Sequence, residues 1–311
     1  MPAASYGIAV AARNLPVTAG STILTLADQF PSNVYAWRTL ARQRGARLAQ
    51  IEVMPGQALN ETLLRALHDH GEALSIVALP HCRWTDGALI DLEAVGALCR
   101  QHGAALVLDL TQSAGALPID LGAVDPDFAV TACYKWLLGP YALGFLHVAD
   151  RWLDGEPLEQ GWIGRAGSED FSRLVDYTDR FAEGAVRFDM GERSSFHLMP
   201  MAVAALEQLL DWGVEDIART LFAKTERIVD FTLERGAGLG LIAPSRTHRA
   251  GHFLGLSRPQ GFPGDLLQTL RARDIHLSQR GNALRVTPHV YNDDEDLERL
   301  FDALLQVLTP A

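Results

Sequence analysis

Lysine is almost absent from this sequence of 311 residues. Of its 27 basic residues only Lys135 and Lys224 are lysine, and all the others are arginine. A guanidinium stays protonated in proteins, whereas a desolvated lysine amine can lose its proton and act as a nucleophile. The two lysines are therefore the first candidates for covalent chemistry. Lys224 lies in the helical pattern AKTERIVD and is expected to be an ordinary surface residue, which leaves Lys135.

Other absences argue against whole classes of protein. The three cysteines (Cys82, Cys99 and Cys133) form no CxxC pair, so we expect neither a disulfide framework nor a metal site. The net charge of −11 without a basic cluster makes a nucleic-acid partner improbable. No apolar run reaches the roughly 18 residues of a membrane-spanning helix, and the first residues lack the layout of a secretory signal. A cytoplasmic protein without a membrane partner is the expectation.

Short apolar runs alternate with helical patterns from the start of the chain to about residue 150, which predicts βαβ units on a mainly parallel sheet. The expected strands are 21–27, 74–79, 104–110, 128–134 and 143–149. The expected helices are 5–15, 33–45, 58–70 and 88–102. Residues 151–190 are predicted to form an irregular excursion that is followed by a long amphipathic helix over 200–213.

The remainder of the chain predicts a smaller α+β unit. Its expected elements are helices over 215–235, 263–273 and 293–308 and strands over 251–257, 275–278 and 283–287. Asp293, Asp294, Glu295 and Asp296 suit the first turn of the last helix, where negative charge complements the helix dipole. We therefore expect an α/β fold with a large domain over 1–213 and a small domain over 214–311.

Two neighbouring strand ends carry an acid and an amine. In open α/β sheets ligands bind beyond the carboxyl ends of the strands. Asp109 ends the apolar run AALVLDL, where a carboxylate is costly without a partner. It could cap the following turn, or it could keep the ring nitrogen of a cofactor protonated. Lys135 follows 26 residues later, at the end of the next strand; a solvated strand-end lysine is the alternative there.

The stretch DLTQSAGALPIDLGAVDPDFAVTACYKWLLGPYALGFLHV (109–148) resembles the cofactor core of the class V aminotransferases. This family of pyridoxal 5′-phosphate (PLP) enzymes includes kynureninases, cysteine desulfurases and transaminases. The resemblance extends to QFPSNVYAWR (29–38), GWIGR (161–165), RFDMGE (187–192) and LRVTPHVYN (284–292). It implies PLP fold type I, in which helices flank a mainly parallel central sheet and a smaller C-terminal α+β domain follows. It also implies a homodimer with shared active sites.

The resemblance implies a role for each matching residue that would hold the cofactor ring. Lys135 would form the Schiff base and move the substrate α-proton. Asp109 would pair with the pyridinium nitrogen, and Gln112 would hydrogen-bond the 3′-oxygen of the cofactor. Phe30 occupies the position of the ring that stacks on PLP, where most relatives have histidine and kynureninases have phenylalanine. Without the family context, Gln112 would be a solvated turn residue and Phe30 plain core.

Further residues would hold the phosphate and the substrate. Ser5 and Tyr134 match phosphate-binding positions, and Trp162 resembles a kynureninase tryptophan that reaches the phosphate from the neighbouring subunit. Ser5 could equally be a helix N-cap and Trp162 a buried structural residue. Arg285 would bind the carboxylate of an amino-acid substrate bidentately, although a surface ion pair is the alternative. Trp84, with Thr85 beside it, is expected to face the same crevice.

These residues favour a PLP enzyme that acts on an amino acid, with transamination as the leading reaction. A kynureninase-like cleavage at the β-carbon is the alternative, supported by Phe30, Tyr134 and Trp162. The absence of any cysteine after Cys133 argues against a desulfurase, and a nucleotide-binding protein would need glycine motifs that the first strand lacks. Relatives have several tens of residues before the position of Ala4, so a catalytically impaired PLP-fold protein is a further hypothesis.

Overall fold

The computed structural model describes residues 1–54 and 57–309, which fall into two units. Unit 1 consists of Met1–His81, Asp91–Ala114 and Ile119–Leu209. Unit 2 consists of Cys82–Ile90, Gly115–Pro118 and Leu210–Ala311. The loop after the strand that ends at Pro80 thus belongs to unit 2, while the division of the chain into domains at residue 213 stays a prediction.

The sheet of unit 1 has six strands in the order β2-β1-β3-β4-β5-β6. Five are parallel: β1 (Thr22–Leu26), β2 (Arg47–Ile51), β3 (Leu74–Pro80), β4 (Ala105–Asp109) and β5 (Phe128–Ala132). β6 (Gly144–Val148) runs antiparallel to β5. The mainly parallel sheet confirms the predicted fold class. The edge strand β2 was not predicted, because its residues are only half-buried and carry no apolar run.

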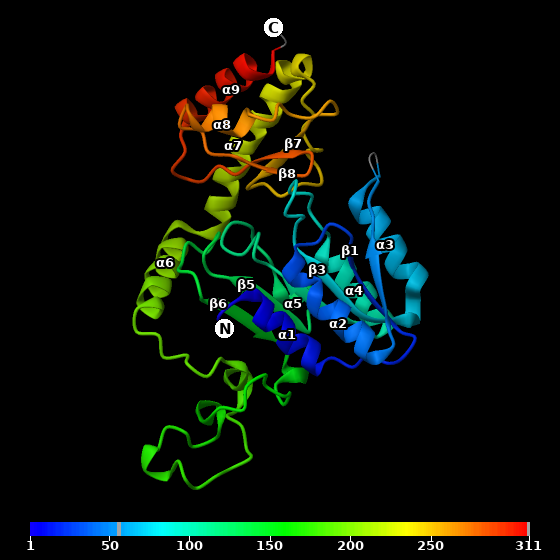
Figure 1. Cartoon of the computed structure of the whole chain (residues 1–311), viewed down its shortest axis with the longest axis vertical. Coiled ribbons are helices and arrows are strands. Elements are labelled where there is room, and N and C mark those ends of the chain that lie inside the picture. Colours follow the sequence, from blue (N-terminus) through cyan, green and yellow to red (C-terminus); the bar gives the residue numbers. More distant parts are fainter. Residues whose placement is uncertain (55–56, 310–311) are drawn as a thin grey trace. The chain divides into compact units, whose positions relative to one another are not determined.

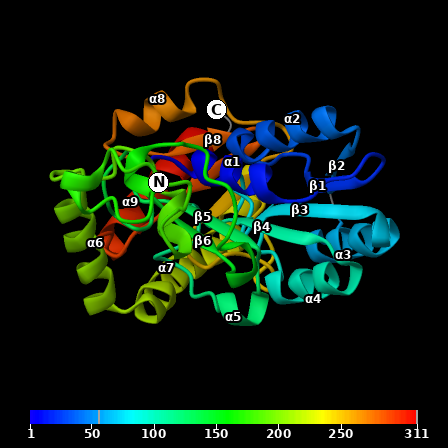
Figure 2. The same cartoon turned by 90° about the horizontal axis from the view of Figure 1, so that it is seen from below.

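Helices cover both faces of this sheet (Figure 2). α1 (Ala4–Asn14) and α2 (Tyr35–Arg44) lie on one face. α3 (Leu59–His70), α4 (Leu92–His102) and the short α5 (Leu121–Val124) lie on the other. The predicted helix 88–102 begins only at Leu92, because the Asp91 side chain accepts a hydrogen bond from Ala94 N and caps it. The core between α1, α2 and the sheet is built from Ile8, Ile23, Trp37, Ile76, Val107 and Phe128.

After β6 the chain leaves the sheet in a long segment without strands, shown in green in Figure 1. Within it lie only short 3-10 turns at Asp150–Trp152, Trp162–Gly164, Phe171–Arg173 and Gly184–Phe188. The predicted irregular excursion is therefore present, and we call residues 153–197 the arm. α6 (Leu198–Trp212) follows it. None of the helices in the described part of the chain is long and apolar enough to cross a membrane.

Unit 2 contains a three-stranded antiparallel sheet in the order β7-β9-β8, formed by β7 (Leu254–Ser257), β8 (Ser278–Arg280) and β9 (Ala283–Val286). Its helices are α7 (Val214–Glu234), α8 (Leu266–Arg271) and α9 (Asp294–Leu308). Asp293 and Asp296 form a capping box at the start of α9. The strand predicted over 275–278 pairs only from Ser278, because Ile275 and Leu277 pack against the core before pairing begins.

Lys224 on α7 differs from its prediction as an ordinary surface residue. Its side chain is half-buried, and its Nζ donates a hydrogen bond to the backbone oxygen of Asn292. This contact fixes the segment between β9 and α9. Lys224 therefore has a structural role in unit 2.

Candidate active site

The carboxyl ends of β1, β3, β4 and β5 lie along one edge of the sheet, which we call the carboxyl edge. Asp109 is the last residue of β4 and lies between Pro80 of β3 and Val130 of β5 in the register. Lys135 follows three residues after the end of β5. The sequence prediction that the acid and the amine share one edge is therefore confirmed at the level of the strands.

Asp109 is buried, with 8% of its surface exposed. Its Oδ1 accepts a hydrogen bond from Thr111 N at 3.0 Å, so the carboxylate does cap the turn that follows β4. Thr111 Oγ1 in turn accepts from Ala132 N at 3.1 Å, which ties this turn to the end of β5. Burial raises the pKa of Asp109, and the hydrogen bonds of Thr111 and the charge of Lys135 oppose that rise.

A tight turn after β5 positions Lys135. Leu138 N donates to Lys135 O at 3.0 Å, and Gly139 N donates to Cys133 O at 2.9 Å. A Cβ on Gly139 would lie 2.2 Å from Cys133 Sγ, so any side chain there would force the turn to shift. Leu138 adopts a left-handed φ of 55°, which is strained for a side chain of this kind. The backbone around the lysine is thus closely determined.

Two aromatic rings flank the amine. Lys135 Nζ lies 5.5 Å from the centroid of the Phe30 ring and 5.9 Å from that of Tyr134. The Tyr134 ring stacks on Tyr141, with centroids 4.1 Å apart. Phe30 is 37% exposed, so the alternative of a plain core residue is wrong. The structure therefore brings Phe30, Tyr134, Lys135 and Asp109 to one place.

The segment that carries Phe30 is braced by its own side chains. Gln29 Oε1 accepts from Phe30 N at 2.7 Å, and Asn33 Oδ1 accepts from Trp37 Nε1 at 2.9 Å. Gln29 and Asn33 are both buried. These hydrogen bonds fix the backbone of the segment QFPSNVYAW, and the fixed backbone in turn presents the Phe30 ring at the carboxyl edge.

The remaining predicted residues of unit 1 have different surroundings. Gln112 is buried rather than a solvated turn residue. Ser5 is exposed, and the N-cap of α1 is Ala3, so the N-cap alternative for Ser5 is wrong. The start of α1 nevertheless lies at the carboxyl edge, because Gly144 N donates to Met1 O at 2.8 Å and Gly144 pairs with Ala132.

Trp162 lies in the arm and is 48% exposed, so it is not a buried structural tryptophan. Its ring packs edge-on against Phe171, with centroids 5.3 Å apart. Within the described residues, the Trp162 ring therefore packs against another residue of the arm.

The predicted substrate residues, Arg285 and Trp84, belong to unit 2. Arg285 lies on β9, and its guanidinium is 4.3 Å from the centroid of the Phe253 ring. Burial lowers the pKa of Arg285 to about 10. Trp84 lies in the loop Cys82–Ile90, where the guanidinium of Arg280 is 5.7 Å from its ring.

Two buried polar residues at the carboxyl edge were not predicted. His81 directly follows β3, and burial lowers the pKa of its imidazole to about 4, so the ring is neutral. Within the described residues, His81 Nδ1 and Gln29 Nε2 have no hydrogen-bond partner. For His81 the sequence signal is a polar residue directly after a buried apolar run, whereas Gln29 lies three residues after the end of β1 and has no such signal. Such groups favour a polar ligand at this edge.

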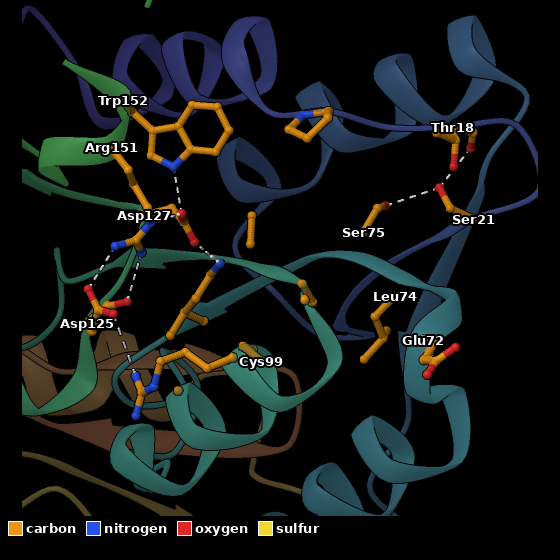
Figure 3. Close-up of a pocket in the computed structure, with 17 residues that line it drawn as sticks. Thr18, Ser21, Glu72, Leu74, Ser75, Cys99, Asp125, Asp127, Arg151 and Trp152 are labelled. Carbon is orange, nitrogen blue, oxygen red and sulfur yellow. Dashed lines mark hydrogen bonds and ion pairs between the residues drawn. The ribbon is translucent and has the colours of Figure 1, made fainter. Parts of the chain in front are cut away.

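A cavity of about 520 Å³ lies at the opposite edge, around the amino ends of β3 and β4 (Figure 3). Its buried carboxylate, Asp127, accepts hydrogen bonds from Leu106 N at 2.7 Å, Trp152 Nε1 at 2.6 Å and Arg151 Nε at 2.7 Å. These donors satisfy Asp127 and join the strands to the segment after β6. None of the predicted site residues lines this cavity, so it is not the candidate active site.

Comparisons with known proteins show what the whole chain is similar to. The family described as aminotransferase class-V matches residues 3–300. A kynureninase of Deinococcus radiodurans is 33% identical over 191 residues, which are 61% of this chain and 42% of that protein. The uncharacterized aminotransferase YcbU of Bacillus subtilis is 28% identical over 238 residues, 74% of this chain and 58% of that protein. The chain thus spans about half the length of these two relatives.

Among solved structures, a cysteine desulfurase from Thermococcus onnurineus superposes with a TM-score of 0.85. The match covers 99% of this chain and 78% of that chain, at 21% sequence identity. At this identity the likeness concerns the fold alone.

Proposed function

Because the chain belongs to the class V aminotransferase family and PLP is its cofactor, we propose that it transfers the amino group of an α-amino acid. One observation supports this proposal most strongly. The amine of Lys135 lies beside the Phe30 ring and within electrostatic reach of the buried carboxylate of Asp109. PLP is a pyridine aldehyde. Its protein must supply an amine that can bond the aldehyde, a carboxylate beside the ring nitrogen and an apolar surface against the ring.

The donor set at the carboxyl edge fits PLP. Asp109 is deep enough to be shielded from water, and Phe30 presents a half-exposed ring face. Gln29 and His81 add buried polar atoms that lack partners among the described residues. A nucleotide would instead need a glycine-rich phosphate loop after a strand, which this edge lacks in sequence.

The proposed roles follow from these positions. When bound, PLP supplies an electron-poor ring that stabilises negative charge on a substrate carbon. Asp109 keeps the proton on the ring nitrogen, and Lys135 Nζ accepts and returns the substrate α-proton. Phe30 would pack against the cofactor ring, and Gln112 would hold the 3′-oxygen of the cofactor.

Phosphate and substrate binding are proposed for the remaining residues. Ser5 and Tyr134 donate to the phosphate, and Trp162 contributes from a second copy of the chain. Ser5 is suited to this because helix N-termini bind anions. Arg285 binds the substrate carboxylate through its planar fork, and Trp84 forms part of the substrate surface.

A kynureninase-like cleavage at the β-carbon is a second candidate reaction. The 33% identity to a kynureninase favours it, as does a phenylalanine at position 30. These features concern how PLP is held, whereas the bond that breaks depends on the substrate. Catalytic impairment would be indicated by cofactor binding without any turnover. A desulfurase is not proposed, because no cysteine follows Cys133.

We also propose a homodimer that works in the cytoplasm. The arm exposes large apolar side chains, among them Tyr177 at 92% and Phe171 at 70%. Exposed apolar surface of this kind is typical of association sites. A second copy of the chain that covers the arm would bury these apolar side chains.

The two lysines provide a matched test of the cofactor site. Lys135→Arg keeps the positive charge but cannot bond the cofactor aldehyde, so the purified variant should lose the yellow colour that wild type shows with PLP. Lys224→Arg should keep the colour, because Lys224 binds the backbone oxygen of Asn292, and an arginine can donate a similar bond. A colourless wild type that takes up no PLP would overturn the proposal.

The reaction is then assigned with amino acids alone and with a 2-oxo acid acceptor. Turnover that depends on the acceptor supports transamination. Cleavage of kynurenine to 2-aminobenzoate without an acceptor would favour the second candidate and contradict the first.

A further inference from the structure

One face of the small sheet in unit 2 carries two arginines. Arg285 of β9 pairs with Ser278 of β8, and Arg280 lies two residues after Ser278. Cross-strand partners point to the same face of a sheet, as do residues two apart on one strand. Arg280 and Arg285 therefore form a diagonal pair on one face. The opposite face carries Leu254, Leu256, Leu284 and Val286, which belong to the core of unit 2.

The loop Cys82–Ile90 lies on the arginine face. Gly255, the β7 partner of Arg285, donates its N–H to Asp86 O at 3.0 Å. A Cβ on Gly255 would lie 2.8 Å from Asp86 Cα, so the glycine lets the loop approach the sheet closely. Each guanidinium then lies over an aromatic ring: Arg280 over Trp84 at 5.7 Å and Arg285 over Phe253 at 4.3 Å. Cation–π contacts of this kind hold both heads in place.

The charge of Arg280 is not balanced by the nearby carboxylate of Asp86. Asp86 accepts from Arg83 Nη2 at 2.6 Å and from Ala88 N at 3.0 Å, so it is engaged within its own loop. Throughout residues 1–54 and 57–309, no carboxylate forms an ion pair with Arg280. The charge of Arg280 adds to burial in lowering the pKa of Arg285. Two like charges brought together in this way favour binding of an anion.

We propose that Arg280 binds a second carboxylate, so that Arg285 and Arg280 together select amino acids with an acidic side chain and the corresponding 2-oxo diacids. This deepens the proposed function, since it takes Arg285 as the group that binds the α-carboxylate. Diagonal positions on a sheet are about 7–8 Å apart, a separation that two guanidinium forks can bridge to the two ends of a short dicarboxylate. Trp84 acts here as the support that orients Arg280.

Succinate and butyrate provide matched probes, because both have four carbons and only succinate has two carboxylates. Calorimetric titration of the full chain should show succinate binding at least about tenfold more tightly than butyrate. Arg280→Gln should abolish this preference while leaving butyrate unchanged. Arg285→Gln should weaken both ligands. Arg273→Gln, at an exposed arginine that bonds Gln306, is the control and should change neither.

Arg280→Lys separates charge from geometry. It should retain part of the preference for succinate because it keeps the positive charge, and lose the rest because a lysine lacks the planar fork. Thermal unfolding of each variant identifies any that fails to fold. Equal affinity for the two probes in wild type, or an unchanged preference in Arg280→Gln, would overturn the proposal. Tighter binding of 2-aminobenzoate than of succinate would also overturn it, because Trp84 would then line an aromatic site.

These titrations need neither cofactor uptake nor turnover, so their outcome is separate from that of the PLP proposal. With PLP present, L-aspartate and L-glutamate should change the cofactor spectrum at lower concentration than L-alanine. Loss of that difference in Arg280→Gln gives a second, spectroscopic readout.

Discussion

Asp109 and Asp127 are both buried aspartates of unit 1, yet their surroundings differ in kind. Asp127 accepts from three donors that include a guanidinium and an indole N–H. Asp109 has the Thr111 hydrogen bonds and the charge of Lys135, and burial outweighs both in setting its pKa. The first is a structural carboxylate, whereas the partners of the second within the protein leave part of its desolvation cost uncompensated.

This contrast predicts opposite effects of the same substitution in the cofactor-free protein. Because the folded-state pKa of Asp109 is raised, its stabilising contribution is present at acidic pH and is lost as the pH rises through that pKa. Asp109→Asn should therefore raise the free energy of unfolding at pH 7 and leave it nearly unchanged at pH 3. Asp127→Asn should lower it by about 2 kcal/mol at pH 7, since it weakens the charge-assisted hydrogen bonds from Arg151, Trp152 and Leu106 to a buried acceptor. Urea unfolding at the two pH values measures both.

A lower free energy of unfolding for Asp109→Asn than for the cofactor-free wild type at pH 7 would contradict the prediction that burial of Asp109 is costly. Its partners in the protein would then outweigh burial, and no cofactor would be needed to explain the carboxylate. With PLP added, Asp109→Asn should show at least about a hundredfold lower turnover, because a neutral amide cannot keep the ring nitrogen protonated.

Phe30 offers a test of how the cofactor is held. Phe30→Ala removes the ring beside Lys135 and should weaken PLP binding by about tenfold, the scale of one aromatic stacking contact. Phe30→His keeps a planar ring and should lose less. The dissociation constant from equilibrium dialysis gives the measurement. An unchanged constant in Phe30→Ala would show that the cofactor does not lie against this ring.

At the residue scale, the sequence predicted a site residue where an amino-acid type was rare in the chain or where a charged residue ended an apolar run. Lys135 was identified by the scarcity of lysine, and Asp109 by a carboxylate at the end of an apolar run. Arg280 and Thr111 had no such signal. The place of Arg280 depends on strand register, because Ser278 pairs with Arg285, and that of Thr111 depends on its hydrogen bond with Ala132; neither is visible in sequence spacing.

At the scale of elements, the buried strands were predictable because each is an apolar run that ends in a turn. β2 was missed, since an edge strand with two exposed polar residues has no such run. The antiparallel direction of β6 was not predicted, although the short connection before it is visible in the sequence. It follows from the short turn between Cys133 and Leu143, in which Cys133 N donates to Leu143 O at 2.9 Å.

That turn also predicts a coupling between Gly139 and Cys133. Gly139→Ala places a methyl group 2.2 Å from the Cys133 sulfur and should destabilise the protein by about 2 kcal/mol. It should also reduce PLP uptake, because the same turn positions Lys135. Cys133→Ala removes the sulfur, so the double variant should be less destabilised than the sum of the single variants. A double-mutant cycle from denaturant unfolding measures the difference.

Strict additivity in that cycle would contradict the close contact between the two residues. Gly238→Ala is a suitable control, because a Cβ there would meet no atom within 4 Å. It should show no coupling with Cys133→Ala.

At the scale of the whole molecule, the arm and α6 together expose apolar side chains that a folded monomer would leave in water. Phe196 is 90% exposed, and Val175, Met201 and Leu210 are more than half exposed. Val175→Asp combined with Tyr177→Asp should therefore convert a dimer to a monomer in sedimentation experiments. Leu233→Asp, on α7 and also well exposed, should not change the assembly.

Mixing of inactive variants tests whether the arm completes the active site of a second copy. If Trp162 acts across the dimer, a chain with Trp162→Ala keeps its own Lys135 and receives an intact tryptophan from a Lys135→Arg partner. Random reassociation then gives one complete site in each heterodimer, so about a quarter of the sites regain activity. If Trp162 serves its own chain, every site in the mixture lacks one of the two residues and activity stays absent. Recovery upon mixing would thus assign the exposed arm to catalysis in the neighbouring subunit, and its absence in a proven heterodimer would confine each site to one chain.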